Sequence, residues 1–401
     1  MRVAIAGAGF AGLAAADALA AAGVDVIVLE ARDRVGGRVL SRELENGAVV
    51  EMGAEFILPG NETVLSYVDR FGLGLWEKGM LYGEREPRGG IGVSVGAVHD
   101  AVALIGEALR GNEAGVSAAE LLDRLPLDPG ASEAIRSRLE VSTAATADRV
   151  EAAALAGIAA HSDDVCPSVA GGNQRLALAL AAELGSIVHL SSVVESVTWG
   201  EGAMVVRAGG AELSVDRVVL AVPASVIGRI VVDPPLPEPL RAAYASVEYG
   251  HAAKLFVPLS RKTVPSAVLS VPERYWSWTA TGSGGVQPVV NAFAGSSPAL
   301  ARLRVADGPT AWLESLERLR PDLALSPKGA VLTTWDDDPW VRAAYSCAAP
   351  GVSAWAPSGP FHACGEHTHE SSRALMDGAL ASGLRVAQEV LDTRYALSLN
   401  S

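Results

Sequence analysis

The stretch VAIAGAGFAGLAAADALAAAGVDVIVLEARDRVGGR, residues 3–38, decides the fold of this chain. Its first four residues, 3–6, are apolar and typical of a short buried strand. The Ala- and Leu-rich residues 13–22 predict a helix, and the apolar, β-branched residues 24–29 predict a second buried strand. A strand, a helix and a strand of these lengths predict one βαβ unit, and therefore a parallel sheet.

Between the first strand and the helix, Gly7, Gly9 and Gly12 form the pattern G-x-G-x-x-G. In this context such glycines let the chain turn tightly and approach a pyrophosphate, whose charge is stabilised by the unpaired N–H groups of the helix N-terminus. Glu30 ends the second strand, where an acid accepts hydrogen bonds from a ribose diol and repels a 2′-phosphate. The order of these parts predicts a dinucleotide site.

A second glycine turn follows at once in the segment ARDRVGGR, residues 31–38. A nicotinamide enzyme has no need of this turn. The whole opening resembles the extended fingerprint of the FAD-dependent amine oxidase superfamily, which includes monoamine oxidases, polyamine oxidases and L-amino-acid oxidases. The resemblance implies that FAD is the dinucleotide. It also implies that Gly36, Gly37 and Arg38 lie against the FAD diphosphate, with Arg32 in the same cofactor-binding set.

The chain has 401 residues, which is too many for one ordinary domain, so we expect two domains. Hydrophobic residues make up 49% and charged residues 19%, which is enough apolar material for a sizeable core. The net charge is −14, from 32 Lys and Arg against 46 Asp and Glu. It argues against a nucleic acid partner, whose phosphates require a basic surface, and is compatible with steering of cationic substrates or with simple solubility.

Nothing in the sequence indicates a secreted or membrane-bound protein. Cys166, Cys347 and Cys364 form neither a C-x-x-C pair nor a zinc quartet, so we expect reduced thiols. The apolar run 10–28 is interrupted by Gly and Asp and is explained by the βαβ unit, so we expect no membrane anchor. Because the first strand begins by Val3, we expect no signal peptide and a cytoplasmic protein.

The segment VVEMGAEFI, residues 49–57, resembles the family's short strand and turn beside the flavin ring. The resemblance implies that the small residues Gly53 and Ala54 let the isoalloxazine approach the backbone. It places Glu55 and Phe56 directly afterwards, at the edge of the ring.

Two later matches also concern the cofactor. Val194 takes the place of a valine that contacts the adenine region in the family. Lys254 stands in YGHAAKLFV, residues 249–257, where a lysine of the family reaches flavin N5 through a bound water. The apolar neighbours of Lys254 predict a buried strand, and a buried lysine requires a water, a carbonyl or the flavin as its partner. We therefore expect Lys254 to be catalytic.

Residues 336–346 resemble the family's segment that faces the flavin. Tyr345 matches one tyrosine of the family's aromatic cage, which implies that it holds the amine, and it is our second catalytic candidate. Ala344 matches the cysteine that carries FAD covalently in mammalian monoamine oxidases, so FAD should be bound noncovalently here. Leu375, also placed at the cofactor, stands where monoamine and plant polyamine oxidases have the second cage tyrosine. Half the cage is missing, which leaves the substrate class open.

Residues 365–385 resemble the superfamily's C-terminal FAD motif. The resemblance implies that Glu366 lies near the ribityl-diphosphate and that a helix starting around Met376 points its N–H groups at a pyrimidine carbonyl of the flavin. The dipole of that helix would stabilise the negative charge of a reduced flavin. His367 and His369 have no further His or Cys at ligand spacing, so we expect no metal site.

The fold class that follows is α/β, with a Rossmann-type FAD-binding domain and an inserted α+β substrate domain whose sheet is flanked by helices. Tyr275, Trp276 and Trp278 cluster in a predicted strand of the substrate domain, and they are as consistent with a substrate pocket as with ordinary core. We expect the discontinuous FAD-binding domain at residues 1–75, 166–255 and 336–401, and the substrate-binding domain at 76–165 and 256–335.

Four local predictions concern the regions around these motifs. A helix is expected at 61–70 with Asn61 as its N-cap, and loops or a hairpin at 79–96. Helices that begin with capping-box spacing are expected at 117–125 and at 148–160.

These features predict an oxidase that uses FAD to take hydride from the α-carbon of a primary or secondary amine. The products would be an imine, hydrolysed to an aldehyde or ketone, and hydrogen peroxide from molecular oxygen. An L-amino-acid oxidase is the first alternative, and it needs an arginine for the carboxylate, for which Arg88, Arg274 and Arg373 are candidates. A flavin desaturase of the protoporphyrinogen or carotenoid type and a nonenzymatic FAD-binding sensor are further alternatives. The oligomeric state, a homodimer included, stays open.

Overall fold

The computed structural model describes residues 1–399 except 91, 112–114, 161–163 and 201–203. The N-terminal βαβ unit lies in a parallel sheet of five strands, in the order β23-β12-β1-β2-β8. The first strand is therefore central, and the predicted βαβ unit is confirmed. The strands are β1 (Arg2–Ala6), β2 (Asp25–Leu29), β8 (Val188–His189), β12 (Arg217–Leu220) and β23 (Phe361–Ala363).

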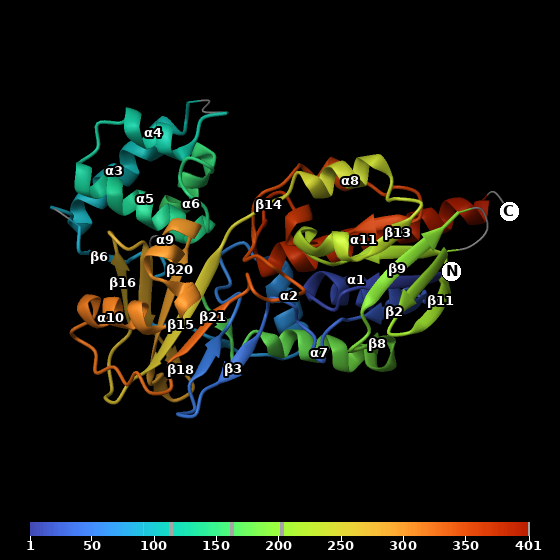
Figure 1. Cartoon of the computed structure of the whole chain (residues 1–401), viewed down its shortest axis with the longest axis horizontal. Coiled ribbons are helices and arrows are strands. Elements are labelled where there is room, and N and C mark those ends of the chain that lie inside the picture. Colours follow the sequence, from blue (N-terminus) through green and yellow to red (C-terminus); the bar gives the residue numbers. More distant parts are fainter. Residues whose placement is uncertain (91, 112–114, 161–163, 201–203, 400–401) are drawn as a thin grey trace.

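Side chains of β1 alternate between two cores because successive residues of a strand point to opposite faces of the sheet. Val3 and Ile5 belong to one core and Ala4 and Ala6 to the other. Figure 1 shows helices on one side of this sheet and a second, smaller sheet on the other. The helices are α1 (Phe10–Ala21), α2 (Glu62–Arg70), α7 (Gln174–Leu184) and α11 (Met376–Leu399); the smaller sheet has β9 (Val194–Trp199), β10 (Met204–Ala208), β11 (Ala211–Val215) and β13 (Val231–Asp233), with α8 (Glu238–Ala245) beside it.

The other half of the molecule contains a mixed sheet of six strands, in the order β21-β15-β20-β17-β16-β6 (Figure 1). All its pairs are antiparallel except β16 with β6. The hairpin considered for residues 79–96 is wrong, because β6 pairs in parallel with a strand that lies far along the chain. The strands are β6 (Glu86–Arg88), β15 (Ala252–Pro258), β16 (Ser266–Ser270), β17 (Tyr275–Thr279), β20 (Val289–Gly295) and β21 (Val331–Thr334), and α9 (Ser297–Arg302) and α10 (Thr310–Leu319) pack on one face.

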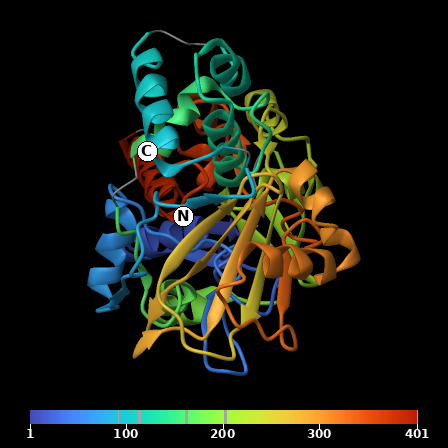
Figure 2. The same ribbon diagram turned by 90° about the vertical axis from the view of Figure 1, so that its left-hand side faces the viewer.

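A group of helices stands over the end of the six-stranded sheet, as Figure 2 shows in a view turned by 90°. The capping box at Ser117 is confirmed, because Ser117 and Glu120 bond each other's backbone N–H groups. The continuous helix at 148–160 is wrong, because Ala118 N–H donates to the Val150 carbonyl and fixes that backbone in an extended pairing. The helices are α3 (Val95–Ala108), α4 (Ala118–Arg124), α5 (Pro129–Thr143) and α6 (Ala156–Ala160), with a short 3₁₀ turn at Ala152–Leu155.

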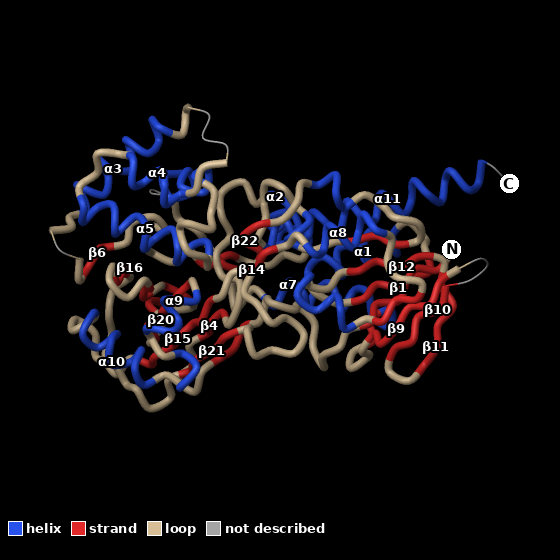
Figure 3. Tube along the Cα trace, turned by 45° about the horizontal axis from the view of Figure 1, so that its top comes forward, coloured by secondary structure: helices blue, strands red, loops and turns tan. Residues whose placement is uncertain are grey.

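Short two-stranded ladders lie where the chain crosses between the two halves, and Figure 3 shows β14 and β22 at this junction. No helix in the described part of the chain is both long and apolar enough to cross a membrane. In the same part of the chain all three cysteines are free thiols. The ladders are β3 (Ser41–Glu43) with β4 (Val49–Glu51), β5 (Leu75–Trp76) with β7 (Ser168–Val169), and β14 (Glu248–Tyr249) with β22 (Ser346–Ala348); a further ladder, β18 (Thr281–Gly282) with β19 (Gly285–Val286), lies in the half with the six-stranded sheet.

The N-terminus of α2 receives its cap from a distant residue. Asn61 stands at the N-cap position, but its side chain accepts from Leu58 N–H and not from the helix. Asp377, in the first turn of α11, accepts from the N–H groups of Thr63 and Val64 at 2.8 and 3.1 Å. The helix and its N-cap position at Asn61 are therefore confirmed, but the capping acceptor comes from a tertiary contact and not from the Asn61 side chain.

The substitution Asp377→Ala should lower the free energy of unfolding by about 1–2 kcal/mol, because it removes the acceptor from two N–H groups of α2. Thermal unfolding of the purified protein would measure this as a lower midpoint. Asp377→Asn keeps one carbonyl oxygen and should lose less than half as much. Equal midpoints for the wild type and Asp377→Ala would show that α2 needs no such cap.

Candidate functional site

A cavity of about 340 Å³ runs from the carboxyl edge of the parallel sheet to the six-stranded sheet. Its lining begins at Ala6 and Leu29, the last residues of β1 and β2, and continues to Lys254, Trp276 and Trp278 on β15 and β17. The carboxyl edge of a parallel sheet is where α/β proteins bind their ligands. The cavity therefore joins a nucleotide-type edge to a chamber formed by the second sheet.

The glycine turn after β1 forms one wall of the cavity. Gly7 and Gly9 line it, and α1 begins without a side-chain cap, so its first N–H groups are available to an anion. Gly12 does not line the cavity. A Cβ at Gly12 would lie 2.0 Å from the Gly7 carbonyl oxygen, so its absence lets the helix pack against the turn. Each glycine of the motif thus has a place that a pyrophosphate site requires.

Glu30 stands at the end of β2, buried in the cavity wall. Its two carboxylate oxygens accept from Ala8 N–H at 2.7 Å and from Arg32 N–H at 2.9 Å. These bonds fix the carboxylate at the edge where the ribose diol of a dinucleotide is expected. Arg32 also lines the cavity and pairs with Asp338, a residue that the sequence reasoning did not single out.

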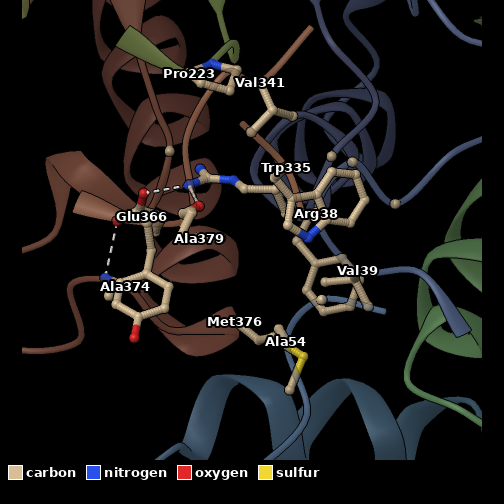
Figure 4. A pocket seen from close by; sticks show the side chains of 18 of the residues that line it. Arg38, Val39, Ala54, Pro223, Trp335, Val341, Glu366, Ala374, Met376 and Ala379 are labelled. Atoms are coloured by element: carbon tan, nitrogen blue, oxygen red, sulfur yellow. Dashed lines mark hydrogen bonds and ion pairs between the residues drawn. The ribbon is translucent and has the colours of Figure 1, made fainter. Parts of the chain in front are cut away.

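The second glycine turn lies beside the first. Gly36 and Gly37 line the cavity, and Gly36 has φ of 100°, a conformation that L side chains rarely adopt. Arg38 follows, and its Nη1 donates to the Ala344 carbonyl at 2.8 Å and to Glu366 Oε1 at 2.9 Å (Figure 4). The arginine of the fingerprint is therefore held in the cavity by two C-terminal residues.

Glu366 collects donors from three segments of the chain. Besides Arg38, Ser346 donates through its N–H at 3.2 Å and its hydroxyl at 2.5 Å, and Ala374 N–H donates at 2.9 Å. Burial raises the pKa of Glu366, but the positive charge of Arg38 and the hydrogen bonds outweigh it, so the pKa is lowered. The carboxylate thus stays ionised and anchors the loop that leads to α11, as Figure 4 shows.

The N-terminus of α11 meets the cavity at Leu375 and Met376, and Met376 lies close to Ala54 in Figure 4. Gly53 and Ala54 form the neighbouring wall. A Cβ at Gly53 would lie 1.7 Å from the Arg38 carbonyl oxygen, so only glycine fits. Small residues and a helix N-terminus therefore face the same part of the cavity.

Lys254 occupies a buried ionic cluster on β15. Its Nζ donates to Glu55 Oε2 at 2.9 Å and to the Glu51 carbonyl at 2.8 Å. Lys78 donates to the other oxygen of Glu55 at 3.0 Å. Burial raises the pKa of Glu55, but the two ammonium groups outweigh it and the pKa is lowered. Lys254 and Glu55 line the cavity, whereas Lys78 does not, so one face of the cluster is available to a ligand.

Aromatic side chains surround the far end of the cavity. The rings of Trp276 and Trp278 are stacked, with centroids 4.1 Å apart, and Phe56 lies 5.7 Å from each. Tyr82 completes this group with its ring 4.9 Å from Phe56. Tyr275 points to the opposite face of β17 and bonds Ser315, so the predicted aromatic cluster divides into two cavity residues and one core residue.

Tyr345 lines the same chamber, and its hydroxyl donates to the Ser142 carbonyl at 2.8 Å, which fixes the ring. Ala344 and Leu375 also line the cavity, and Val194 does so at the nucleotide end. Thus every predicted site residue except Gly12 lines this same cavity.

The three arginines considered for a carboxylate lie elsewhere. Arg88 pairs with Glu86 and Asp322, and Arg274 pairs with Glu133 and Glu140. Arg373 donates to the Ala349 carbonyl. None of the three lines the cavity among the described residues.

The sequence reasoning missed several residues that line or support the cavity. Most of them lie in loops, whereas Ser142 lies near the end of α5. Asp338 and Trp340 stand in the segment 336–346, which the family resemblance had already marked as facing the flavin. The charged Lys78 and Arg85, which flank a short segment with Tyr82 and two glycines, were a weak signal. The missed residues are Lys78, Tyr82, Arg85, Ser142, Trp335, Asp338 and Trp340.

The fold and the site together define a dinucleotide-binding α/β protein with a second, mixed sheet over its ligand. The sequence pattern of the flavin containing amine oxidoreductase family matches residues 10–87 and 108–391. The chain belongs to this family. A flavin is therefore the cofactor that the family implies, and the glycine turns, the uncapped α1 and the long cavity fit FAD.

Individual relatives are distant. The chain is 28% identical to putrescine oxidase of Kocuria rosea over 97% of this chain and 95% of that protein. It is 24% identical to an L-amino-acid oxidase of Daboia russelii, covering 97% and 88%. Its fold matches the solved structure of cyclohexylamine oxidase from Brevibacterium oxydans with a TM-score of 0.84 at 18% identity, over 98% of this chain and 99% of that one.

Proposed function

We propose that this chain is an FAD-dependent oxidase of primary or secondary amines. The observation that carries the proposal is the single cavity that joins the glycine turns at Gly7 and Gly36 to Lys254 and the aromatic chamber. Relatives named as amine oxidases support the same class of substrate. The division into an FAD-binding domain and an inserted substrate domain is part of this proposal.

Bound FAD would supply the hydride acceptor, and molecular oxygen the final electron acceptor, with hydrogen peroxide as the product. The protein's part is to position an amine in the chamber and to exclude water from it. Trp276, Trp278 and Phe56 provide apolar walls that favour an uncharged amine, the form whose α-carbon can release a hydride. Loss of the hydride leaves an iminium ion, the protonated imine, which water hydrolyses to an aldehyde or ketone with release of ammonia or an amine.

Three groups serve the cofactor and the amine in this proposal. Lys254, held by Glu55, presents its ammonium group to the chamber and would hold a water at the reacting edge of the flavin. The N-terminus of α11 would stabilise negative charge on the reduced ring. Tyr345, fixed by Ser142, would hold one side of the amine, while Leu375 leaves the other side open to larger substrates.

The activity can be tested by measuring hydrogen peroxide release from the FAD-loaded protein over a panel of primary, secondary and diamines. We expect peroxide and the matching aldehyde or ketone in equal amounts. Flavin reduction without any peroxide would instead support a dehydrogenase or desaturase.

FAD should be bound noncovalently, because Ala344 offers no sulfur for a thioether bond. Acid precipitation of the yellow protein should therefore release all of the flavin into the supernatant, where absorbance at flavin wavelengths measures it. Colour that stays with the pellet would contradict this proposal. Boiled protein that has been digested with a protease provides the control, since a covalent flavin would remain on a peptide.

A further inference from the structure

Arg85 is a buried cation without a carboxylate partner. It lies just before β6, the residue is 8% exposed, and it lines the cavity together with Tyr82 and Trp276. Its Nε donates to the Tyr82 carbonyl at 3.3 Å, while its Nη1 is buried and has no hydrogen-bond partner. Among the described residues no Asp or Glu lies within ion-pair distance of Arg85.

The guanidinium is held by stacking. Its central carbon lies 3.9 Å from the centroid of the Trp276 ring and 5.1 Å from that of the Tyr82 ring. Stacking on aromatic faces fixes the plane of an arginine while its N–H edge stays free for hydrogen bonds. Arg85 therefore stands, with its plane fixed, at the wall between the chamber and a neighbouring cavity, both of which it lines.

Several other buried or half-buried arginines of this acidic chain are paired with carboxylates. Arg38 pairs with Glu366, Arg274 with Glu140, and Arg320 with Asp322. Leaving a charge buried and unpaired costs several kcal/mol, so Arg85 requires a compensating anion. Arg138 is also buried without a carboxylate, but its Nη2 donates to the Ile158 carbonyl and it lines only a neighbouring cavity. The positive charge of Arg138 adds to that of Arg85 and raises the electrostatic attraction of this end of the chamber for an anion.

We propose that Arg85 binds the carboxylate of the substrate, so that the oxidised compound is an amine that carries a carboxylate group. The amine part of this inference rests on the proposed function, whereas the carboxylate site does not. The stacked Trp276 and Trp278 connect the two ends of the chamber, because Lys254 Nζ lies 5.9 Å from the Trp278 centroid. The substrate would lie along this pair, with its carboxylate at Arg85 and its amine-bearing carbon towards the end where Lys254 lies.

Binding can be measured without turnover, by titrating the FAD-loaded protein with phenylacetate and following the flavin absorbance spectrum. Phenylacetamide is the neutral control of the same shape. We expect phenylacetate to bind at least 10-fold more tightly than phenylacetamide. In Arg85→Gln the affinity for phenylacetate should fall about 10- to 100-fold, with phenylacetamide unchanged, because a charge-assisted bidentate contact is lost.

Arg88→Gln is the matched control, because Arg88 lies three residues away and outside the cavity, and it should leave both affinities within twofold of the wild type. Arg85→Lys keeps the positive charge but loses the two parallel N–H donors of the guanidinium, and should retain part of the preference for phenylacetate. Equal binding of phenylacetate and phenylacetamide to the wild type would overturn the proposal. So would unchanged phenylacetate binding in Arg85→Gln, which would make Arg85 a structural cation stacked on Trp276.

A kinetic arm identifies the position of the amine relative to the carboxylate. Anaerobic flavin reduction is measured with phenylalanine, with 3-amino-3-phenylpropanoate, and with phenethylamine, which lacks the carboxylate. We expect one of the two acids to react with at least 10-fold higher kcat/KM than phenethylamine, and Arg85→Gln to remove this preference mainly through KM. Faster reduction by phenethylamine would overturn the proposal. If phenylacetate binds in an Arg85-dependent way but no amine reduces the flavin, the proposed amine oxidase function is wrong, while the carboxylate site at Arg85 stands.

Discussion

Glu366→Ala should yield a protein that has lost most of its FAD and unfolds at a lower temperature than the wild type. Among the described residues the substitution leaves the Ala344 carbonyl as the one remaining hydrogen-bond acceptor of the Arg38 side chain, and it removes the acceptor from Ser346 and Ala374 N–H. Breaking a buried ion pair by removing one partner costs about 3–5 kcal/mol. The measurements are the thermal midpoint and the FAD retained after gel filtration.

Glu366→Gln separates charge from hydrogen bonding, because the amide keeps one acceptor oxygen. Its midpoint and FAD content should lie between those of the wild type and Glu366→Ala. The folded-state pKa of Glu366 is lowered, so its ionised form contributes stability above the unfolded pKa that is lost as the pH falls through the folded pKa. The difference between the wild type and Glu366→Gln should therefore shrink at acidic pH. Full FAD retention by Glu366→Ala would contradict the role of this carboxylate.

Lys254→Met should reduce the rate of amine oxidation about 10²- to 10³-fold while FAD stays bound. The reason is that Lys254 is the one ammonium group of its cluster that reaches the cavity, where a preorganised cation stabilises developing charge. In the described part of the chain Lys254 makes no hydrogen bond or ion pair with Arg38 or Glu366, so the anchor of the C-terminal loop should stay intact. Stopped-flow absorbance measures reduction of the flavin by amine and its reoxidation by oxygen as separate steps.

Lys78→Met is the control for Lys254→Met, because Lys78 is equally buried and pairs with the same carboxylate but does not line the cavity. Both variants should lower the thermal midpoint, since each leaves Glu55 with one ammonium group. The oxidation rate should fall far less in Lys78→Met than in Lys254→Met. Equal losses of rate in the two variants would show that Lys254 acts only by holding Glu55.

The structural features that could be predicted from the sequence are those determined by residues close together in the chain. The apolar runs at residues 3–6 and 24–29 predicted the central strands, and the glycines at Gly7 and Gly36 predicted the turns, because strand, turn and helix preferences act over a few residues. Motif resemblance also placed Lys254, Tyr345 and Glu366 in a single cavity, although they stand far apart in the chain.

The parts that escaped prediction depend on contacts between distant segments. Asn61 occupies the N-cap position of α2 as expected, but Asp377, from the far end of the chain, supplies the acceptor for the helix N–H groups. Residues 150–152 pair with the segment before α4, which overrides the helical pattern there. Arg85 was missed because it stands out only by the lack of a nearby carboxylate in the folded chain. A sequence does not show which side chains lie near each other in space.

The most direct test of the central claim is anaerobic mixing of the FAD-loaded protein with amines in a stopped-flow spectrometer. We expect at least one amine to bleach the oxidised flavin spectrum in a single turnover, and admission of oxygen to restore the spectrum with one equivalent of hydrogen peroxide. A flavin that stays oxidised with every primary amine, secondary amine and amino acid tested would contradict that claim.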